Sequence, residues 1–129
     1  MVRLELAVPP IPSSVPEARS AVRAWLDRLP YSEQTRADVL IVLSELVTNG
    51  VLHDGGSAIT VSATGDRTGI FLEVDTADRL PTSTSYHREM GDPSEAGRGL
   101  AIVSALTDSV TTVADRGRRH VRCHLSARP

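Results

Sequence analysis

Residues 36–53 read RADVLIVLSELVTNGVLH, which is the longest apolar run in the chain. Three polar residues interrupt it four positions apart: Glu45, Asn49 and His53. On an α-helix this spacing places the three in one stripe along a single face. The other faces are apolar, which is typical of a helix that is buried on most sides. A carboxylate and an amide on such a helix are costly unless a partner, metal or ligand satisfies them, so the stripe is the first indication of a site.

The composition is that of a soluble globular domain. The 129 residues are 40% hydrophobic and 23% charged, which suits a single domain with one core. Aromatic residues make up only 3%, so the core is expected to consist of Val, Leu, Ile and Ala. The formal net charge of -2 gives no reason to expect direct nucleic-acid binding. The one basic cluster, Arg116, Arg118, Arg119 and Arg122, is interpreted as a solvated hairpin.

Further features bear on location and exclude one kind of phosphate-binding loop. The single cysteine, Cys123, cannot form an internal disulfide, which favours the cytoplasm. Arg3 and Glu5 interrupt the first apolar residues, so no signal peptide is expected, and no run is long enough to span a bilayer. All 14 basic residues are arginine. A P-loop requires a lysine, so that route to binding ATP is excluded.

Apolar periodicity and turn residues predict the order of elements. Ser14 is a candidate N-cap of a first helix, with Glu17 in a capping-box position, and Ser32 is a candidate N-cap of a second. A third helix is expected to open at Gly97. Strands are expected at residues 2–8, 58–63, 69–74, 107–113 and 120–125.

The dipeptide Asn49-Gly50 offers an alternative, because it is also a common type I′ hairpin turn and would then cut the second helix short. The apolar pattern resumes in helical phase at Val51 and Leu52, which favours a continuous helix. Gly50 inside a helix would cost about 1 kcal/mol relative to alanine.

This order predicts an α+β fold. We expect a two-layer sandwich, in which a mixed, largely antiparallel sheet of about five strands is covered on one face by three helices. Residues 76–96 lack periodicity and are polar. Their length is typical of a lid or a binding loop.

Three groups of residues are candidates for chemistry. Gly97-Arg98-Gly99 at a helix start would expose backbone N–H groups at the positive end of the helix dipole, an anion site, although a tight turn is the alternative. Asp75 at a strand end could accept a hydrogen bond from a ligand amine or simply begin a turn. Glu45 and Asn49 could supply a general base and an oxygen ligand for Mg²⁺, or form a solvated helix edge.

The last predicted strand also has a polar face. His120, Arg122 and His124 alternate with apolar residues, so they should share one face and leave Val121, Cys123 and Leu125 for the core. An exposed polar face is favoured over a metal site, because no further ligand stands nearby in the sequence.

Taken together, three segments resemble the conserved boxes of the GHKL (Bergerat-fold) ATP-binding superfamily. They are ELVTNGVLH (Glu45–His53) for the N-box, DTADRLP (Asp75–Pro81) for the G1 box and GRGLAIV (Gly97–Val103) for the G2 box. The short chain and the lead-in SVPEAR (Ser14–Arg19) are most similar to the anti-sigma-factor serine kinase branch and its stand-alone actinobacterial regulators.

The resemblance implies a role for each box. Asn49 would ligate the Mg²⁺ that bridges the phosphates of ATP, and Asp75 would accept a hydrogen bond from the adenine 6-amino group. Glu45 would orient or deprotonate the attacking hydroxyl. The backbone of the G2 box would hold the phosphates, with Arg98 near them; its members are Gly97, Arg98, Gly99 and Leu100.

Some positions depart from the pattern of the superfamily. Thr76, Ala77 and Asp78 stand where the G1 box has glycines, and Gly50 replaces the usual alanine of the N-box. Further departures are His120 in place of a threonine near the adenine site and Arg122 in place of a tryptophan.

The resemblance therefore supports two hypotheses. The first is an ATP-dependent protein serine/threonine kinase that acts on an anti-sigma-factor antagonist and sequesters a sigma factor. Such a kinase could act as a homodimer. The second is a non-catalytic module that regulates by contact, with or without ATP. Glu45 favours the first hypothesis, and the altered G1 and C-terminal positions favour the second.

Overall fold

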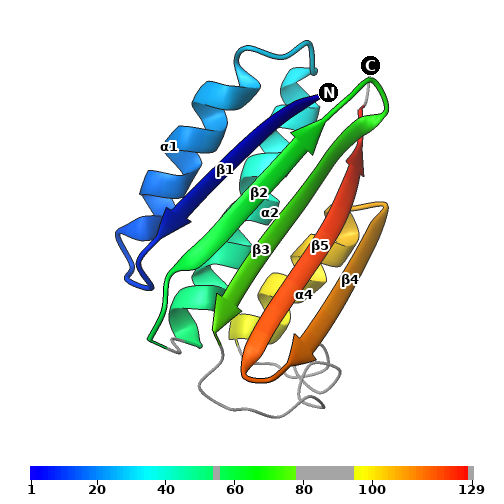
Figure 1. Cartoon of the computed structure of the whole chain (residues 1–129). Coiled ribbons are helices and arrows are strands. Elements are labelled where there is room, and N and C mark those ends of the chain that lie inside the picture. Colours follow the sequence, from blue (N-terminus) through cyan, green and yellow to red (C-terminus); the bar gives the residue numbers. More distant parts are fainter. Residues whose placement is uncertain (54–55, 78–94, 128–129) are drawn as a thin grey trace.

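The computed structural model has one sheet that carries the described helices on a single face (Figure 1). It describes residues 1–53, 56–77 and 95–127, apart from the side chains of residues 95–98 and 115. This arrangement confirms the predicted α+β sandwich. The elements in chain order are β1 (Val2–Val8), α1 (Ser14–Leu26), α2 (Glu33–Leu52), β2 (Ile59–Gly65), β3 (Gly69–Ala77), α4 (Glu95–Leu106), β4 (Ser109–Asp115) and β5 (Arg118–Ser126).

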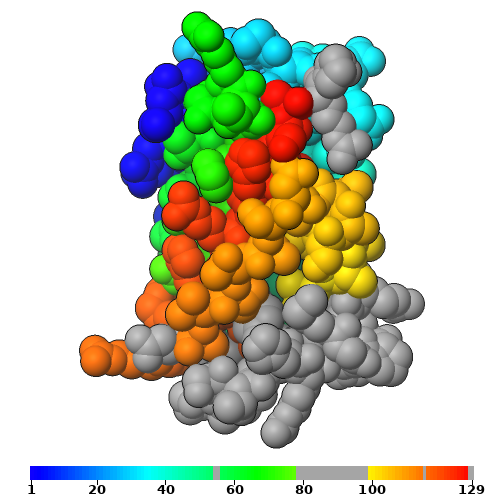
Figure 2. All heavy atoms as spheres, turned by 90° about the vertical axis from the view of Figure 1, so that its right-hand side faces the viewer, coloured from blue at the N-terminus to red at the C-terminus, as the bar shows by residue number. Residues whose placement is uncertain are grey.

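The five strands lie in the order β1-β2-β3-β5-β4, and every neighbouring pair is antiparallel. The sheet of five described strands is therefore wholly antiparallel, in agreement with the largely antiparallel sheet that the sequence pattern predicted. Alternate residues point to an inner face, under the helices, and to an outer face. Figure 2 shows the β4 edge of the sheet with α4 beside it. The last hairpin turns at Arg116 and Gly117, with φ of 52° and 76°, values typical of a two-residue type I′ turn.

Helix α2 is the central element of the helical layer. Its N-cap is Ser32, as predicted, because the Ser32 hydroxyl accepts a hydrogen bond from the Thr35 N–H at 3.2 Å. The helix continues through Gly50 to Leu52, so the alternative of a hairpin turn at Asn49-Gly50 is wrong. Its buried apolar residues are Val39, Leu40, Val42, Leu43, Leu46 and Val47.

The apolar run is not buried on every side. Ile41 and Leu52 are 42% and 52% exposed, so the helix keeps one solvent-facing stripe. The inner face of the sheet completes the core with Ile59, Val61, Ile70, Leu72, Val74, Val121, Cys123 and Leu125. No described helix has the length and apolarity needed to cross a bilayer.

The start of α1 differs from the prediction. Ser13, not Ser14, is the N-cap residue, and its side chain makes no capping hydrogen bond. Ser14 is buried within the first turn, where its hydroxyl donates to the Pro9 carbonyl. The serine is thus used to fix the chain after β1. Further along α1, Arg19 donates from Nη1 to the Ser44 hydroxyl at 2.6 Å, which ties α1 to α2.

The predicted lid spans residues 76–96. Thr76 and Ala77 belong to β3, and Glu95 and Ala96 belong to α4. The rest of the predicted lid, residues 78–94, lies outside the described residues. Asp78 is among these.

Candidate functional site

The described part of the candidate site lies where α2 meets α4. Asn49 is buried, with 6% of its surface exposed, and Glu45 is half-buried one turn earlier on the same face. Gly99 of α4 is their neighbour. A Cβ atom on Gly99 would stand 2.7 Å from Oε2 of Glu45 and 3.8 Å from Oδ1 of Asn49. The two side-chain oxygens therefore converge on one point of the α4 backbone, where the lack of a side chain on Gly99 leaves room for the Glu45 carboxylate.

The G2-box residues occupy the beginning of α4. The helix begins at Glu95, two residues before the predicted start, so Gly97 lies in its first turn. The N–H groups of the first three helical residues have no partner within the helix, and here these belong to residues 95–97. The backbone N–H of Gly97 thus has the potential to bind an anion, whereas Leu100 is buried in the core at 3% exposure. The side chain of Arg98 lies outside the described atoms.

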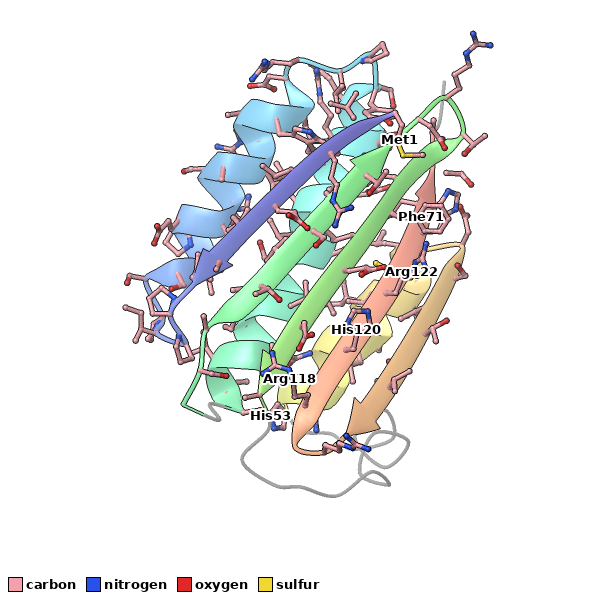
Figure 3. The ribbon with its side chains drawn as sticks, viewed as in Figure 1. Met1, His53, Phe71, Arg118, His120 and Arg122 are labelled. Atoms are coloured by element: carbon pink, nitrogen blue, oxygen red, sulfur yellow. The ribbon has the colours of Figure 1, made fainter. Side chains whose placement is uncertain are left out.

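Asp75 does not join this cluster. It lies on the outer face of β3, where Arg118 donates to Oδ1 from Nε at 2.9 Å and from Nη2 at 2.6 Å. Its other oxygen is 3.7 Å from Nδ1 of His120. Figure 3 shows Arg118 and His120 on the side of the sheet turned away from the helices. The position of Asp75 gives no support to its implied role at adenine.

Asp75 lies on the outer face because side chains along β3 point alternately to the two faces of the sheet. The sequence pattern predicted that the strand ends at Val74, but it continues to Ala77. Because Val74 points into the core, Asp75 must point outward and Thr76 inward. Thr76 is only 5% exposed, and its Cγ2 would be 2.7 Å from a Cβ atom on Gly50. Gly50 therefore lets α2 approach β3 closely, which explains why glycine is accepted inside this helix.

A second inward residue was also missed. Arg119 of β5 pairs in register with Thr76 and is 4% exposed, so the interpretation of its cluster as a solvated hairpin is wrong for this arginine. The same alternation that buries Val121 and Cys123 buries Arg119, and that signal was present in the sequence. His120, which stands at the expected threonine position, instead lies on the outer face, 3.4 Å from Oε2 of Glu73.

The rest of the outer face of β5 is polar, as predicted. Arg122 lies 3.2 Å from Oε1 of Glu73 and stacks 4.7 Å above the ring of Phe71. His124 is 3.3 Å from Oδ2 of Asp108. Among the described residues, no three His, Cys, Asp or Glu side chains gather in a way that could hold a metal ion unaided.

Comparison with known proteins identifies the family. The sequence model of the histidine kinase-like ATPase domain matches residues 8–124, so the chain belongs to that family. This confirms the superfamily that the three boxes predicted. A search of the curated proteins found no significant match.

The fold is similar to a solved structure from Mycobacterium tuberculosis that contains the RsbU and RsbW domains of Rv1364c. The two share 20% sequence identity with a TM-score of 0.73, and the match covers 100% of this chain. The chain spans only 34% of that protein, and at this identity the likeness shows the fold alone.

The residues present fit one end of a magnesium nucleotide. Mg²⁺ takes few protein ligands and keeps phosphate oxygens and waters, so the amide oxygen of Asn49 with Glu45 nearby is a suitable donor set. The N-terminal turn of α4 suits phosphate oxygens. Where the paired ends of β3 and β5 meet, the described polar residues on the inner face of the sheet are Thr76 and Arg119, and no described carboxylate lies there.

Proposed function

We propose that this chain binds a magnesium nucleotide between α2 and α4 and acts as an ATP-dependent regulator of the anti-sigma-factor kind. One observation carries the proposal: the oxygens of Glu45 and Asn49 converge on the backbone of Gly99. The tight glycine contact brings a hard-cation ligand, a carboxylate and a helix N-terminus together. Membership of the histidine kinase-like ATPase family supports the same ligand.

Each residue then has a defined task. Asn49 would hold Mg²⁺ through its amide oxygen, and the free N–H groups of the first turn of α4, including that of Gly97, would bind the phosphates. The bound metal ion would neutralise charge on the phosphates, which is the main requirement of phosphoryl transfer. Arg19 supports the site from outside, because it fixes α1 to Ser44, the residue that precedes Glu45.

We further propose protein serine/threonine kinase activity. A substrate hydroxyl oxygen forms the new bond to the γ-phosphorus while the bond from that phosphorus to the β–γ bridging oxygen breaks. Glu45 accepts the hydroxyl proton. The substrate class is an anti-sigma-factor antagonist, and the protein also binds a sigma factor. The resemblance of the three boxes and of the lead-in Ser14–Arg19 to the anti-sigma-factor serine kinase branch supports this assignment.

The experiment is calorimetric titration with Mg-ATP, followed by a phosphorylation assay on a candidate antagonist. Asn49→Ala should weaken binding. Glu45→Gln should bind Mg-ATP but transfer no phosphate, while Glu73→Gln on the outer face serves as the matched control and keeps both activities. Equal phosphorylation by the wild type and Glu45→Gln would show that Glu45 is not the base.

A second candidate function is a binding module that works without nucleotide. The observation that favours it is the pairing of Asp75 with Arg118 on the outer face, which leaves the implied adenine contact unmade. In that case Mg-ATP would produce no heat of binding, and a sigma factor would be retained equally well with and without nucleotide.

A further inference from the structure

The strand at one end of the sheet lacks the features that usually protect an edge. β1 and β4 are the two edge strands of the described sheet. An edge strand presents unpaired backbone N–H and C=O groups, and natural proteins commonly guard it with charged residues or proline. β1 is guarded in this way, because it carries the exposed ion pair of Arg3 and Glu5. Residues 109–114 of β4, by contrast, include no charged residue and no proline.

Helix α4 lies beside this edge and continues the uncharged surface (Figure 2). Residues 99–114 contain a single charged residue, Asp108, in a chain that is 23% charged. Asp108 is used within the chain, because its carboxylate accepts a hydrogen bond from the backbone N–H of Ser126 at 2.6 Å. The other exposed residues of this range are Ala101, Ile102, Ser104, Ala105, Ser109, Thr111 and Val113. Depletion of charge is typical of the centre of a protein–protein interface.

The hairpin that joins β4 to β5 determines which backbone groups point away from the sheet. A two-residue turn at Arg116 and Gly117 makes Asp115 and Arg118 a backbone hydrogen-bonded pair, and such pairs recur at every second residue. Further back along β4, the residues whose backbone bonds to β5 are therefore Ser109, Thr111 and Val113. The residues whose N–H and C=O groups point to the open edge are Val110, Thr112 and Ala114.

The open edge is complementary to itself. Two β4 strands that run antiparallel about a two-fold axis at Thr112 would pair Thr112 with its own copy, and Val110 with Ala114 of the second copy. Each outward N–H would then meet an outward C=O. On the outer face, Thr111 would stand opposite Val113 of the second copy, so that β-branched side chains meet and no like charges do.

The helical layer is compatible with the same pairing. A two-fold axis perpendicular to the sheet keeps the helices of both copies on one face, with the two α4 helices nearest the seam. The distance between packed helices depends on the side chains at the contact, and the small Ala101 and Ser104 would let a second α4 approach closely.

We propose that the β4 edge, with α4 beside it, is an interface with a second copy of this chain, in which two β4 strands join the sheets of both copies into one. The interface uses neither Glu45 nor Asn49, so it forms with or without nucleotide. Its failure would leave the proposed nucleotide site untouched.

Sedimentation velocity of the full chain over a range of concentrations measures the association. The wild type is expected to pass from monomer to dimer as the concentration rises, and to do so equally with and without Mg-ATP. A monomer at every concentration into the millimolar range would overturn the inference and leave the edge to a strand of another protein.

Double variants at the exposed positions of β4 test the register. Thr111→Lys with Val113→Glu sets opposite charges across the seam and should dimerise at least as tightly as the wild type. Thr111→Lys with Val113→Lys sets like charges there and should raise the dissociation constant of the dimer at least tenfold. Thr60→Lys with Ser62→Lys, on the outer face of β2, adds the same charges away from the seam and is the matched control, with a change within about twofold.

Circular dichroism checks that each variant folds. If the lysine pair on β4 does not fold, the comparison of Thr111→Lys with Val113→Glu against the single variant Thr111→Lys replaces it, and the single variant should dimerise less tightly. Equal association of the charge-paired and the lysine-bearing β4 variants would overturn the inference.

Discussion

Replacement of Gly99 by alanine should separate stability from ligand binding. The new Cβ would stand 2.7 Å from Oε2 of Glu45, whereas ordinary contact begins at 3.4 Å, so the oxygen must move by the difference of 0.7 Å. Glu45 is half-buried and has a flexible side chain, so it can change rotamer at little cost. Alanine in place of a helical glycine meanwhile stabilises the helix by about 1 kcal/mol.

The expected result is a protein that is as stable as the wild type, or up to about 1 kcal/mol more stable, with impaired function. A displaced carboxylate and a methyl group beside the Asn49 oxygen should weaken Mg-ATP binding at least tenfold, equivalent to about 1.4 kcal/mol. Misplacement of a catalytic group by about 1 Å can cost a hundredfold in rate, so phosphoryl transfer should fall further.

Thermal unfolding and calorimetric titration of the same samples measure the two effects. Ser104→Ala, at an exposed position of α4, is the control, because it should improve helix propensity without touching the site. Wild-type binding by Gly99→Ala would refute the reasoning that the two oxygens and the α4 backbone form the ligand site.

Three further predictions concern the scaffold. Gly69→Ala should destabilise the protein by about 2–4 kcal/mol in chemical denaturation, because φ is 150° and the Cβ would lie 2.1 Å from the Leu125 carbonyl oxygen; Gly56→Ala, where nothing lies within 4 Å, should cost less. Tyr31→Phe should cost about 1–2 kcal/mol, because the hydroxyl donates to two carbonyls of the β2–β3 turn. Burial raises the pKa of Tyr31, so this part of the stability is present below about pH 10 and is lost as the pH rises beyond it, a loss that Tyr31→Phe should not show. Burial also raises the pKa of Cys123 to about 12, so iodoacetamide at neutral pH should modify the thiol only after unfolding, and rapid labelling of the native protein would contradict this.

Much of the architecture follows from local patterns. The apolar phase at Val51 and Leu52 correctly predicted that α2 continues through Asn49-Gly50, although that dipeptide is a strong turn signal. Ser32 was correctly predicted as its cap, because a serine hydroxyl that accepts a hydrogen bond from the backbone N–H three residues later is a local arrangement. Ser14 was predicted wrongly, because its hydroxyl found a partner in the preceding segment, at Pro9.

The candidate site was harder to predict, because its residues are set by strand ends and by contacts between distant elements. A predicted strand that ended at Val74 left the direction of Asp75 open, and the three additional β3 residues, Asp75 to Ala77, decided it. Arg119 was grouped with its basic neighbours by charge, although alternation with Val121 places it inside. The contact of Gly99 with Glu45 joins α4 to α2, and no local pattern encodes that distance.

The central claim is that the end of α2 and the start of α4 hold a magnesium nucleotide. Titration calorimetry of the wild type and of Asn49→Ala with Mg-ATP, with folding of both proteins checked by circular dichroism, tests it most directly. The account predicts binding by the wild type with a Kd in the millimolar range or tighter, and a loss of at least tenfold in Asn49→Ala. Absence of binding to the wild type, or equal binding by both proteins, would contradict it.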